Sequence, residues 1–436
     1  MWMTEDNIVE VAFDKEHLFE LILSPSNLNK AYKAVSGNKG CGGIDKMSWE
    51  ELFPWLLANK DEFIISLQNG TYRPNPVRRV EIPKANGKTR LLGIPTVVDR
   101  LVQQAIHQVL TPIYERQFSM TSYGFRPKRG CHDALRRAQK IVDEGYRYVV
   151  DLDLERFFDT VSHSKLIEIL SHTIKDGRVV SLIHKYLRSG VMNRGLFETS
   201  TEGTPQGGPL SPLLSNIMLN ELDKELESRG HPFVRYADDA LIFCKSKRAA
   251  QRVKESITRF IEGQLFLKVN REKTVVSYVQ GVKFLGYSFY VMKGKCLLTV
   301  HPQSKSKMKF KLKELTSRSN GWGYECRKQK LRKYIRGWLG YYHLAQIKRL
   351  CLETDEWLRR RIRMCIWKSW KNPKTRVANL KKCGVLDWQA YQWGNTRLGY
   401  WRVALSRLLT FAMSNDKLRR AGYASLMDYY LEWYPK

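Results

Sequence analysis

The spacing of apolar residues changes part-way along the chain. Up to about residue 297, short apolar runs rich in β-branched residues alternate with segments whose apolar residues recur at helical spacing, which indicates strands mixed with helices. From about residue 301 the spacing is helical, most clearly in 331–342 and 358–366. We therefore predict an α+β part followed by an all-helical part, with further boundaries at Asn372-Pro373 and Cys383-Gly384.

Two pairs of apolar runs predict β-hairpins. One pair surrounds Asp238 and Asp239, and we expect these adjacent carboxylates at the tip of a tight turn. The other surrounds an Asn-Gly turn and places Lys84 and Arg90 on a basic hairpin that could fold over a triphosphate. Each has a plainer interpretation, because Asp suits turns for its backbone preferences and a basic hairpin can be mere surface.

A third apolar run, 148–152, leads into a cluster of acids. On a strand Asp151 and Asp153 face the same side, because side chains alternate with a period of two. Acids at the end of a strand are also typical helix N-caps. An acid here together with the hairpin pair would make a divalent-metal site, since Mg²⁺ takes few protein carboxylates and completes its shell with water and phosphates. Two such ions about 3.5–4 Å apart can activate a 3′ hydroxyl and stabilise a leaving pyrophosphate.

A loop with three glycines and three prolines occupies 203–212, with Gln206 in its middle. We predict that Ser211 caps a following helix and that Pro212 is its first residue. The preceding loop has little side-chain bulk, so its backbone could approach a flat ligand such as a base pair. The alternative is a plain connector.

The charge of the chain is strongly asymmetric. Its formal net charge is +31, and residues 301–436 hold 31 Lys and Arg against 9 Asp and Glu. The same segment holds nine of the twelve tryptophans. Basic residues interleaved with aromatic ones suit a surface that binds phosphates and stacks on bases, although the tryptophans could instead form the cores of small helical units.

Composition also narrows the cellular setting. We find no apolar run of 18 residues, so we expect no membrane span, and the acidic residues of 1–14 do not form a secretory signal. The eight cysteines include no Cys-x-x-Cys pair, which argues against zinc knuckles and treble-clef nuclease modules. Scattered single cysteines are typical of reduced thiols, so we expect a cytoplasmic protein.

In their order along the chain, these segments resemble the reverse transcriptases of bacterial group II introns. The resemblance rests on the hairpin box, the Gly/Pro loop, the acidic strand and a further motif, which read Tyr236-Ala-Asp-Asp239, Thr204-Pro-Gln-Gly-Gly-Pro-Leu-Ser-Pro212, Asp151-Leu-Asp-Leu-Glu-Arg-Phe-Phe-Asp159 and Ser122-Tyr-Gly-Phe-Arg-Pro127. It continues through 267–274, 281–286, 335–342 and 361–370, and covers the chain from about Ser24 to the end. The sequence looks most like the compact class C type, which lacks an endonuclease domain.

The resemblance implies a right-hand polymerase fold, with fingers and an antiparallel palm sheet followed by an all-helical thumb and a small basic unit. We expect an N-terminal extension and the fingers in 1–145, and the palm with part of the fingers in 146–300. The helical thumb or maturase domain would occupy 301–373, and a basic segment that binds DNA or RNA would occupy 374–436.

The resemblance also assigns roles to single residues. Asp153 would be the first metal ligand, with Asp151 less favoured, because the aromatic residue five positions after Asp153 (Phe158) falls where the family keeps its sugar gate. The proposed metal ligands are Asp153, Asp238, Asp239 and Leu154. The incoming nucleotide would meet Lys84, Arg90, Phe158, Gln206 and Lys273, and the primer end would be gripped by Lys283, Phe284, Leu285 and Gly286.

The implied function is an RNA-directed DNA polymerase that uses two Mg²⁺ ions and dNTPs to extend a DNA or RNA primer on an RNA template. A bulky ring at Phe158 would exclude a 2′ hydroxyl, so the product would be DNA. As a maturase, the protein would also bind its group II intron RNA to promote splicing and mobility, and target DNA is a further expected partner. Two alternatives stay open, namely an RNA-folding cofactor with a dormant polymerase and a relative recruited for defence or repair.

Overall fold

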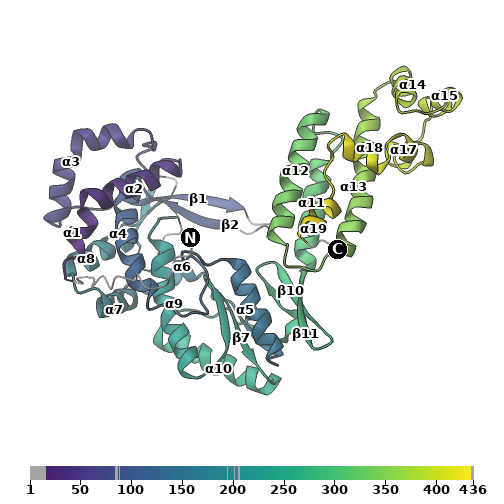
Figure 1. The fold of residues 1–436 in the computed structure, drawn as a ribbon. Coiled ribbons are helices and arrows are strands. Elements are labelled where there is room, and N and C mark those ends of the chain that lie inside the picture. The colour runs from purple at the N-terminus through teal and green to yellow at the C-terminus, as the bar shows by residue number, and fades with distance from the viewer. Residues whose placement is uncertain are drawn as a thin grey trace, which may run out of the picture. The chain divides into compact units, whose positions relative to one another are not determined.

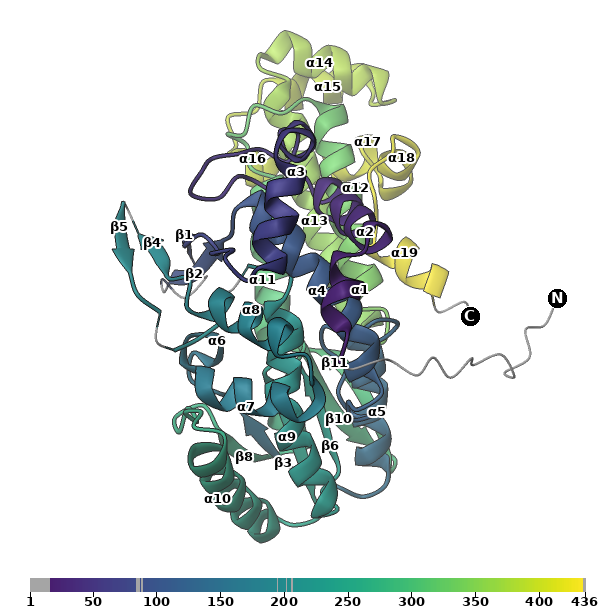
Figure 2. The ribbon, with the colours of Figure 1, turned by 90° about the vertical axis from the view of Figure 1, so that its left-hand side faces the viewer.

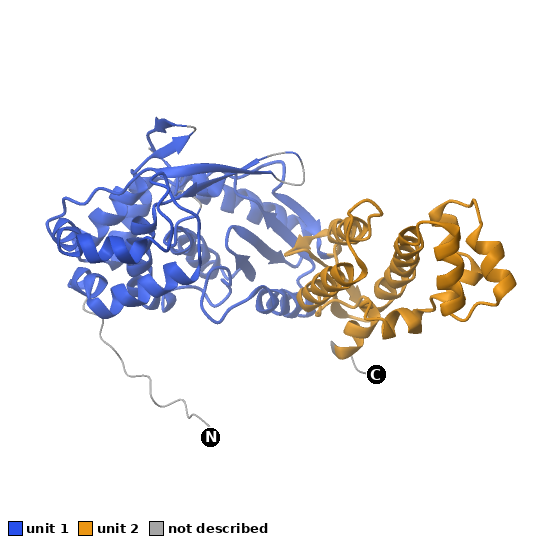
Figure 3. Ribbon diagram, turned by 90° about the horizontal axis from the view of Figure 1, so that it is seen from above, with its two compact units in different colours: residues 1–279 blue, residues 280–436 orange. Residues whose placement is uncertain are grey.

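The computed structural model describes residues 16–83, 87, 89–193, 195–200, 202–204 and 207–433. Lys84 and Gln206 lie outside these residues. The chain divides into two compact units, residues 1–279 and 280–436 (Figure 3).

The first unit contains a four-stranded antiparallel sheet in the order β6-β7-β3-β8, which we call the central sheet. Its strands are β3 (Tyr148–Leu152), β6 (Phe233–Tyr236), β7 (Asp239–Cys244) and β8 (Val275–Tyr278). On β3 and β7, alternate residues such as Val150, Leu152 and Ile242 point into the main hydrophobic core, as the period-two pattern requires. Helix α10 (Lys247–Gln264) packs on β3, β7 and β8 (Figure 2).

A second sheet in the same unit has the order β2-β1-β4-β5. Its strands are β1 (Val77–Pro83), β2 (Thr89–Ile94), β4 (Val191–Asn193) and β5 (Leu196–Glu198). The β1–β2 pair is the predicted basic hairpin, seen as two long arrows in Figure 1. Its last pair is Pro83 with Thr89. The predicted Asn-Gly turn lies between them, where the structure describes only Gly87, so Asn86 falls outside the described residues.

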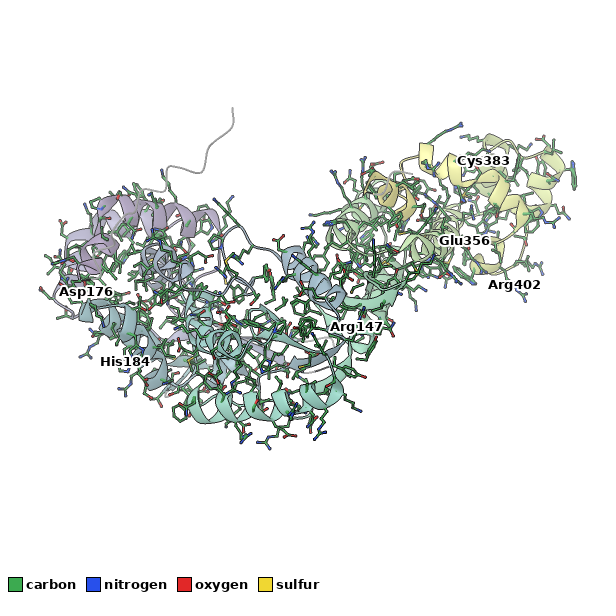
Figure 4. All side chains as sticks on the ribbon, turned by 60° about the horizontal axis from the view of Figure 1, so that its bottom comes forward. Arg147, Asp176, His184, Glu356, Cys383 and Arg402 are labelled. Carbon is green, nitrogen blue, oxygen red and sulfur yellow. The ribbon has the colours of Figure 1, made fainter. Side chains whose placement is uncertain are left out.

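Helices supply the rest of the first unit. Helix α2 packs on α4, and the carboxylate of Asp176, at the start of α8, accepts the backbone N–H of Phe19 at 2.9 Å and so ties α8 to α1 (Figure 4). The bounds are α1 (Leu18–Leu23), α2 (Pro25–Gly37), α3 (Leu52–Gln68), α4 (Val97–Glu115), α5 (Cys131–Asp143), α6 (Phe157–Thr160), α7 (His163–Thr173), α8 (Gly177–Leu187) and α9 (Ser211–Ser228).

The second unit opens with a small antiparallel sheet and is otherwise helical. The sheet comprises β9 (Lys283–Phe284), β10 (Tyr287–Met292) and β11 (Lys295–Val300). The longer helices are α11 (Pro302–Leu315), α12 (Tyr324–Tyr341) and α13 (Lys348–Ser369). Shorter helices follow: α14 (Pro373–Lys382), α15 (Asp387–Gly394), α16 (Tyr400–Val403), α17 (Arg407–Ala412), α18 (Asn415–Arg420) and α19 (Leu426–Trp433).

The predicted change from mixed to helical structure is confirmed, since the last strand ends at Val300 and α11 begins at Pro302. The division between the units falls earlier, after Val279, so β9–β11 group with the helices rather than with the central sheet. The four predicted domains, 1–145, 146–300, 301–373 and 374–436, stay a prediction. Among the described residues, no helix is both long and apolar enough to cross a bilayer.

Candidate active site

Strand register brings the predicted acids to one end of the central sheet. The β3–β7 ladder ends with Leu152 opposite Ala240, and Asp153 and Asp239 are the next residues on each side of that pair. Leu152 and Ala240 both belong to the hydrophobic core. Because side chains alternate, Asp153 and Asp239 are directed to the face opposite that core. Two carboxylates 86 positions apart in the sequence thus become neighbours in the sheet.

The hairpin turn differs from the prediction by one residue. Tyr236 pairs with Asp239, so the tip consists of Ala237 and Asp238, and Asp239 is the first residue of β7. The left-handed residue of the turn is Ala237, with φ of 58°. The backbone preference of Asp therefore does not explain the acid pair, because neither acid occupies the left-handed position.

The loop after α10 holds the backbone of Asp153 in place. Thr274 Oγ1 accepts the Asp153 N–H and donates to the Asp153 carbonyl, both at 3.2 Å, and the Asn270 N–H donates to the same carbonyl at 2.9 Å. Lys273 Nζ lies 3.1 Å from Asp153 Oδ2. Asp153 is not a helix N-cap, because that position before α6 is held by Arg156, which makes no side-chain capping bond.

The donor set suits a hard divalent cation. Carboxylate oxygens are the ligands that Mg²⁺ prefers, and Asp153 already accepts one cation, the Lys273 ammonium group. Leu154, whose side chain is buried, offers only its backbone carbonyl oxygen. Within the described part of the chain, no three His, Cys, Asp or Glu side chains form a ready cluster for a metal ion. The residues fit such an ion by chemistry and by strand position.

Phe158 lies at the start of α6, next to the Gly/Pro loop. Its ring is buried and meets Phe157 edge-on, with 5.2 Å between the centroids. Its carbonyl accepts the Thr204 N–H at 2.6 Å. Gly203 has φ of 90°, and a Cβ there would lie 2.9 Å from the carbonyl oxygens of Phe158 and Asp159. Only glycine allows this close seating of the loop on the Phe158 turn.

His163 also holds this loop, a role that sequence reasoning missed. Its Nε2 lies 2.7 Å from the Gly203 carbonyl, which can only accept, so Nε2 carries the hydrogen. Burial lowers the pKa of the His163 imidazole and favours this neutral form. The sequence carried little signal for this role, because His163 follows the Phe-Phe-Asp segment among other polar residues, Ser162, Ser164 and Lys165.

The glycines of the loop pack against the protein itself. A Cβ on Gly207 would lie 2.5 Å from the Gly93 carbonyl oxygen of β2, and one on Gly208 would overlap the Gln103 side chain of α4. Helix α9 begins one residue earlier than predicted. Leu210 is its N-cap and Ser211 its first residue, so Ser211 does not cap the helix and Pro212 is its second residue. Whether the loop also approaches a base pair stays a prediction.

Of the predicted nucleotide contacts, Arg90 is exposed on β2 opposite Ile82. The ammonium group of Lys273 forms an ion pair with the carboxylate of Asp153. The predictions for Lys84 and Gln206 concern residues outside the described part of the chain.

The predicted primer grip, 283–286, is held within the second unit by tyrosines from α12. The Tyr341 hydroxyl donates to the Leu285 carbonyl at 2.8 Å, and a Cβ on Gly286 would lie 2.6 Å from the Tyr342 hydroxyl. Lys283 Nζ donates to Gln303 at 2.9 Å. The motif 335–342 therefore supports the turn, a connection that the sequence pattern did not reveal.

The tryptophans of the second unit divide between the two interpretations. Trp367 and Trp370 are buried, as expected for helical cores. Trp388 and Trp401 expose 65% and 38% of their surface, and the Arg360 guanidinium lies 3.8 Å from the Trp401 ring centroid. Neither interpretation holds for the whole set.

Two family models match the chain. Residues 82–289 match the reverse transcriptase (RNA-dependent DNA polymerase) family, and residues 305–384 match the group II intron, maturase-specific domain. The first match contains the central sheet and the predicted acids. The second contains α11 to α14 except for a few terminal residues.

Relatives support the same family. Protein YkfC of Escherichia coli is 36% identical over 313 residues, which cover 62% of this chain and 82% of YkfC. The group II intron-encoded protein LtrA of Lactococcus lactis is 33% identical over 355 residues, 66% of this chain and 58% of LtrA. An uncharacterized 91 kDa protein in a Schizosaccharomyces pombe cob intron is 40% identical over 229 residues, 51% of this chain and 27% of that protein. The chain thus belongs to the group II intron-encoded reverse transcriptases, with an RNA-directed DNA polymerase domain followed by a maturase domain.

Proposed function

We propose that this reverse transcriptase extends a primer with dNTPs at a site formed by Asp153, Asp238 and Asp239. The observation that carries the proposal is the strand register, which ends with Leu152 opposite Ala240 and so makes Asp153 and Asp239 neighbours. Asp238 lies directly before Asp239, in the turn between β6 and β7. The resemblance adds that these positions hold two Mg²⁺ ions in the family.

The residues of the chain would act by holding and aligning charged groups. Asp153, Asp238, Asp239 and the Leu154 carbonyl would hold the ions, which when bound lower the pKa of the primer 3′ hydroxyl and offset the charge of the pyrophosphate. Lys273 pairs with Asp153 in this structure. When a nucleotide is bound, the Lys273 ammonium group would bind the nucleotide phosphates instead. Lys84, Arg90 and Gln206 would orient the nucleotide, and alignment of this kind accounts for much of the rate in such reactions.

Phe158 would set the choice of sugar. Its buried ring and the Gly203 contact fix the position of its backbone. A fixed ring beneath the sugar leaves no room for a 2′ hydroxyl, so we propose that the product is DNA. Residues 283–286 would grip the primer end, since tyrosines of α12 hold this turn.

The second unit would bind group II intron RNA and promote its splicing and mobility, with target DNA as a further ligand of 374–436. Support comes from the match to the maturase-specific domain and from the excess of 31 basic over 9 acidic residues in 301–436. We also propose a cytoplasmic location, with which the eight cysteines, all free thiols, are compatible.

Primer extension tests the proposal. Asp238→Ala with Asp239→Ala should abolish dNTP incorporation on an RNA template with Mg²⁺ yet leave RNA affinity nearly unchanged, because these acids hold metal rather than RNA. Asp61→Ala, which removes an exposed carboxylate on α3, is the control and should extend normally. Extension by the double variant would contradict the site, and a wild-type protein that binds intron RNA without extending any primer would favour the RNA-folding cofactor.

A further inference from the structure

A charged cluster lies entirely inside the first unit, directly behind the hairpin turn. Arg235, on β6, is completely buried. Its Nε and Nη2 donate to the two carboxylate oxygens of Asp223 at 2.7 and 2.5 Å, and both side chains of this ion pair are fully enclosed. Its Nη1 donates to Asn216 Oδ1 at 3.0 Å and to the Ala237 carbonyl at 2.9 Å.

The cluster joins three segments that the sequence analysis singled out separately. Asn216 and Asp223 lie on α9, which follows the Gly/Pro loop. The Asn216 amide donates to the Gly124 carbonyl at 2.8 Å, in the segment 122–127. A Cβ on Gly124 would overlap the backbone nitrogen of Ala237, so this segment packs directly on the turn. The Arg235 backbone also bonds to this region: its N–H donates to the carbonyl of Thr121, just before the segment, at 3.0 Å, and its carbonyl accepts the Tyr123 N–H at 2.9 Å.

The turn needs such support. Ala237 holds a left-handed conformation that a residue with a Cβ adopts only at some cost in energy. The Arg235 guanidinium fixes its carbonyl from one side and Gly124 encloses its nitrogen from the other. Asp238 is the next residue, and Asp239 follows it. Any movement of the Ala237 peptide would therefore move the first of the two carboxylates.

We propose that Arg235, Asn216 and Asp223 form a positioning unit that fixes Asp238 and Asp239 for metal binding, an inference that rests on the proposed function. All three side chains are buried behind the turn, so we give them a positioning role rather than a catalytic one. The planar guanidinium is required because it donates to a carboxylate, an amide and a backbone carbonyl at once, which an ammonium group cannot do with the same geometry. A purely structural ion pair would stabilise the fold without setting the affinity for metal.

A matched pair of variants separates these roles. Asn216→Ala removes the bonds to Arg235 and Gly124 without leaving a buried charge alone. Asn220→Ala is the control: Asn220 is also buried, lies one turn further along α9, and bonds to the backbone of Ser119 and Gln117. Both variants lose two hydrogen bonds of a buried amide, but only Asn216 bonds to the residues that hold the turn.

The experiment measures primer extension as a function of Mg²⁺ concentration, together with the melting temperature. Supporting partners of metal ligands typically change metal affinity by about 10- to 100-fold, so we expect Asn216→Ala to raise the half-maximal Mg²⁺ concentration by that factor. Asn220→Ala should lower the melting temperature by a similar amount yet leave the Mg²⁺ requirement unchanged. Equal shifts in both variants, or a shift in neither, would overturn the inference.

Two provisions keep the result decisive. If Asn216→Ala does not fold, Asn216→Ser, which leaves a smaller cavity and keeps a polar group, is judged by the same criterion. The outcome is also distinct from a failure of the proposed function. A wild-type protein that shows no metal-dependent extension contradicts the site itself, whereas metal-dependent extension with an unchanged Mg²⁺ requirement in Asn216→Ala contradicts only the positioning unit.

Discussion

Both units bury arginine side chains, but they satisfy them in different ways. In the first unit, Arg235 faces the carboxylate of Asp223, and Arg126 lies 2.7 Å from Glu115. In the second unit, Arg363 donates to the Met413 carbonyl and to Asn415, both at 2.9 Å, and Arg359 donates to the Tyr423 carbonyl at 3.3 Å. One unit opposes buried charge with charge, whereas the other mostly uses neutral oxygen atoms.

The difference changes how the basic excess of the second unit is interpreted. Arg359 and Arg363 count toward its net charge, but they are buried and connect α13 to the segment that follows α16. Asp355, one turn earlier on α13, accepts the backbone N–H groups of Leu426 and Met427 at the start of α19. Part of the positive charge therefore holds the helices together, and only the exposed remainder is available for phosphates.

The largest effect is expected from removing the cation of the first unit. Arg235→Met leaves Asp223 as an uncompensated buried charge, which should lower the free energy of unfolding by about 3–5 kcal/mol. Adding Asp223→Leu should restore much of the loss, since an apolar pair of similar volume replaces the ions. Hydrogen exchange of the β6 and β7 amides measures the change. Full protection in the single variant would show that the ion pair does not support the hairpin.

A smaller loss is expected at the corresponding position of the second unit. Arg363→Met leaves only neutral acceptors unpaired, so we expect a loss of about 1–3 kcal/mol, seen as faster exchange in α17 and α18. Arg402→Met is the control, because Arg402 is exposed on α16 (Figure 4) and should change stability by less than about 0.5 kcal/mol. A larger loss of stability in Arg402→Met than in Arg363→Met would contradict the view that the buried arginines, and not the exposed ones, hold the helices together.

His163 gives the stability of the first unit a pH dependence. Because its pKa is lowered in the fold, the unfolded chain binds a proton first, and stability should fall as the pH drops below about 6.5. His163→Gln, which retains an N–H donor, should reduce this slope. Burial also lowers the pKa of His107, His231 and His301, so the comparison of variant with wild type isolates the contribution of His163. Identical slopes of stability against pH in the wild type and in His163→Gln would contradict this role of His163.

The smallest effect concerns a single phosphate contact. Lys333 is exposed on α12, and Lys333→Gln should reduce the slope of log affinity against log salt by about 0.7–0.9 for one lost contact with RNA. Arg359→Met should leave the slope unchanged, because this guanidinium is buried. Filter binding of intron RNA over a range of salt concentrations gives both values. A change of slope in Arg359→Met alone would mean that the buried arginines bind RNA.

The sequence was sufficient for the fold class and for the order of motifs. Apolar spacing predicted the strands around Asp153 and Asp238–Asp239, and the helices after residue 301. It could not predict the exact residues of the turn, because Ala237 has a left-handed conformation and contacts Gly124, which is far away in the chain. The contact of Gly203 with Phe158 and the bond of Lys273 to Asp153 could not be predicted either, because each joins residues far apart in the chain.

The central claim is that Asp153 and the Asp238–Asp239 pair meet around one cation site. Replacing Mg²⁺ with Fe²⁺ in the presence of ascorbate generates hydroxyl radicals at the bound ion, which cut the nearby backbone. With template, primer and a dNTP bound to the full chain, we predict cuts at both 151–155 and 236–240, which Mg²⁺ should suppress by competition. Cuts confined to one of these segments, or placed elsewhere in the chain, would contradict the account.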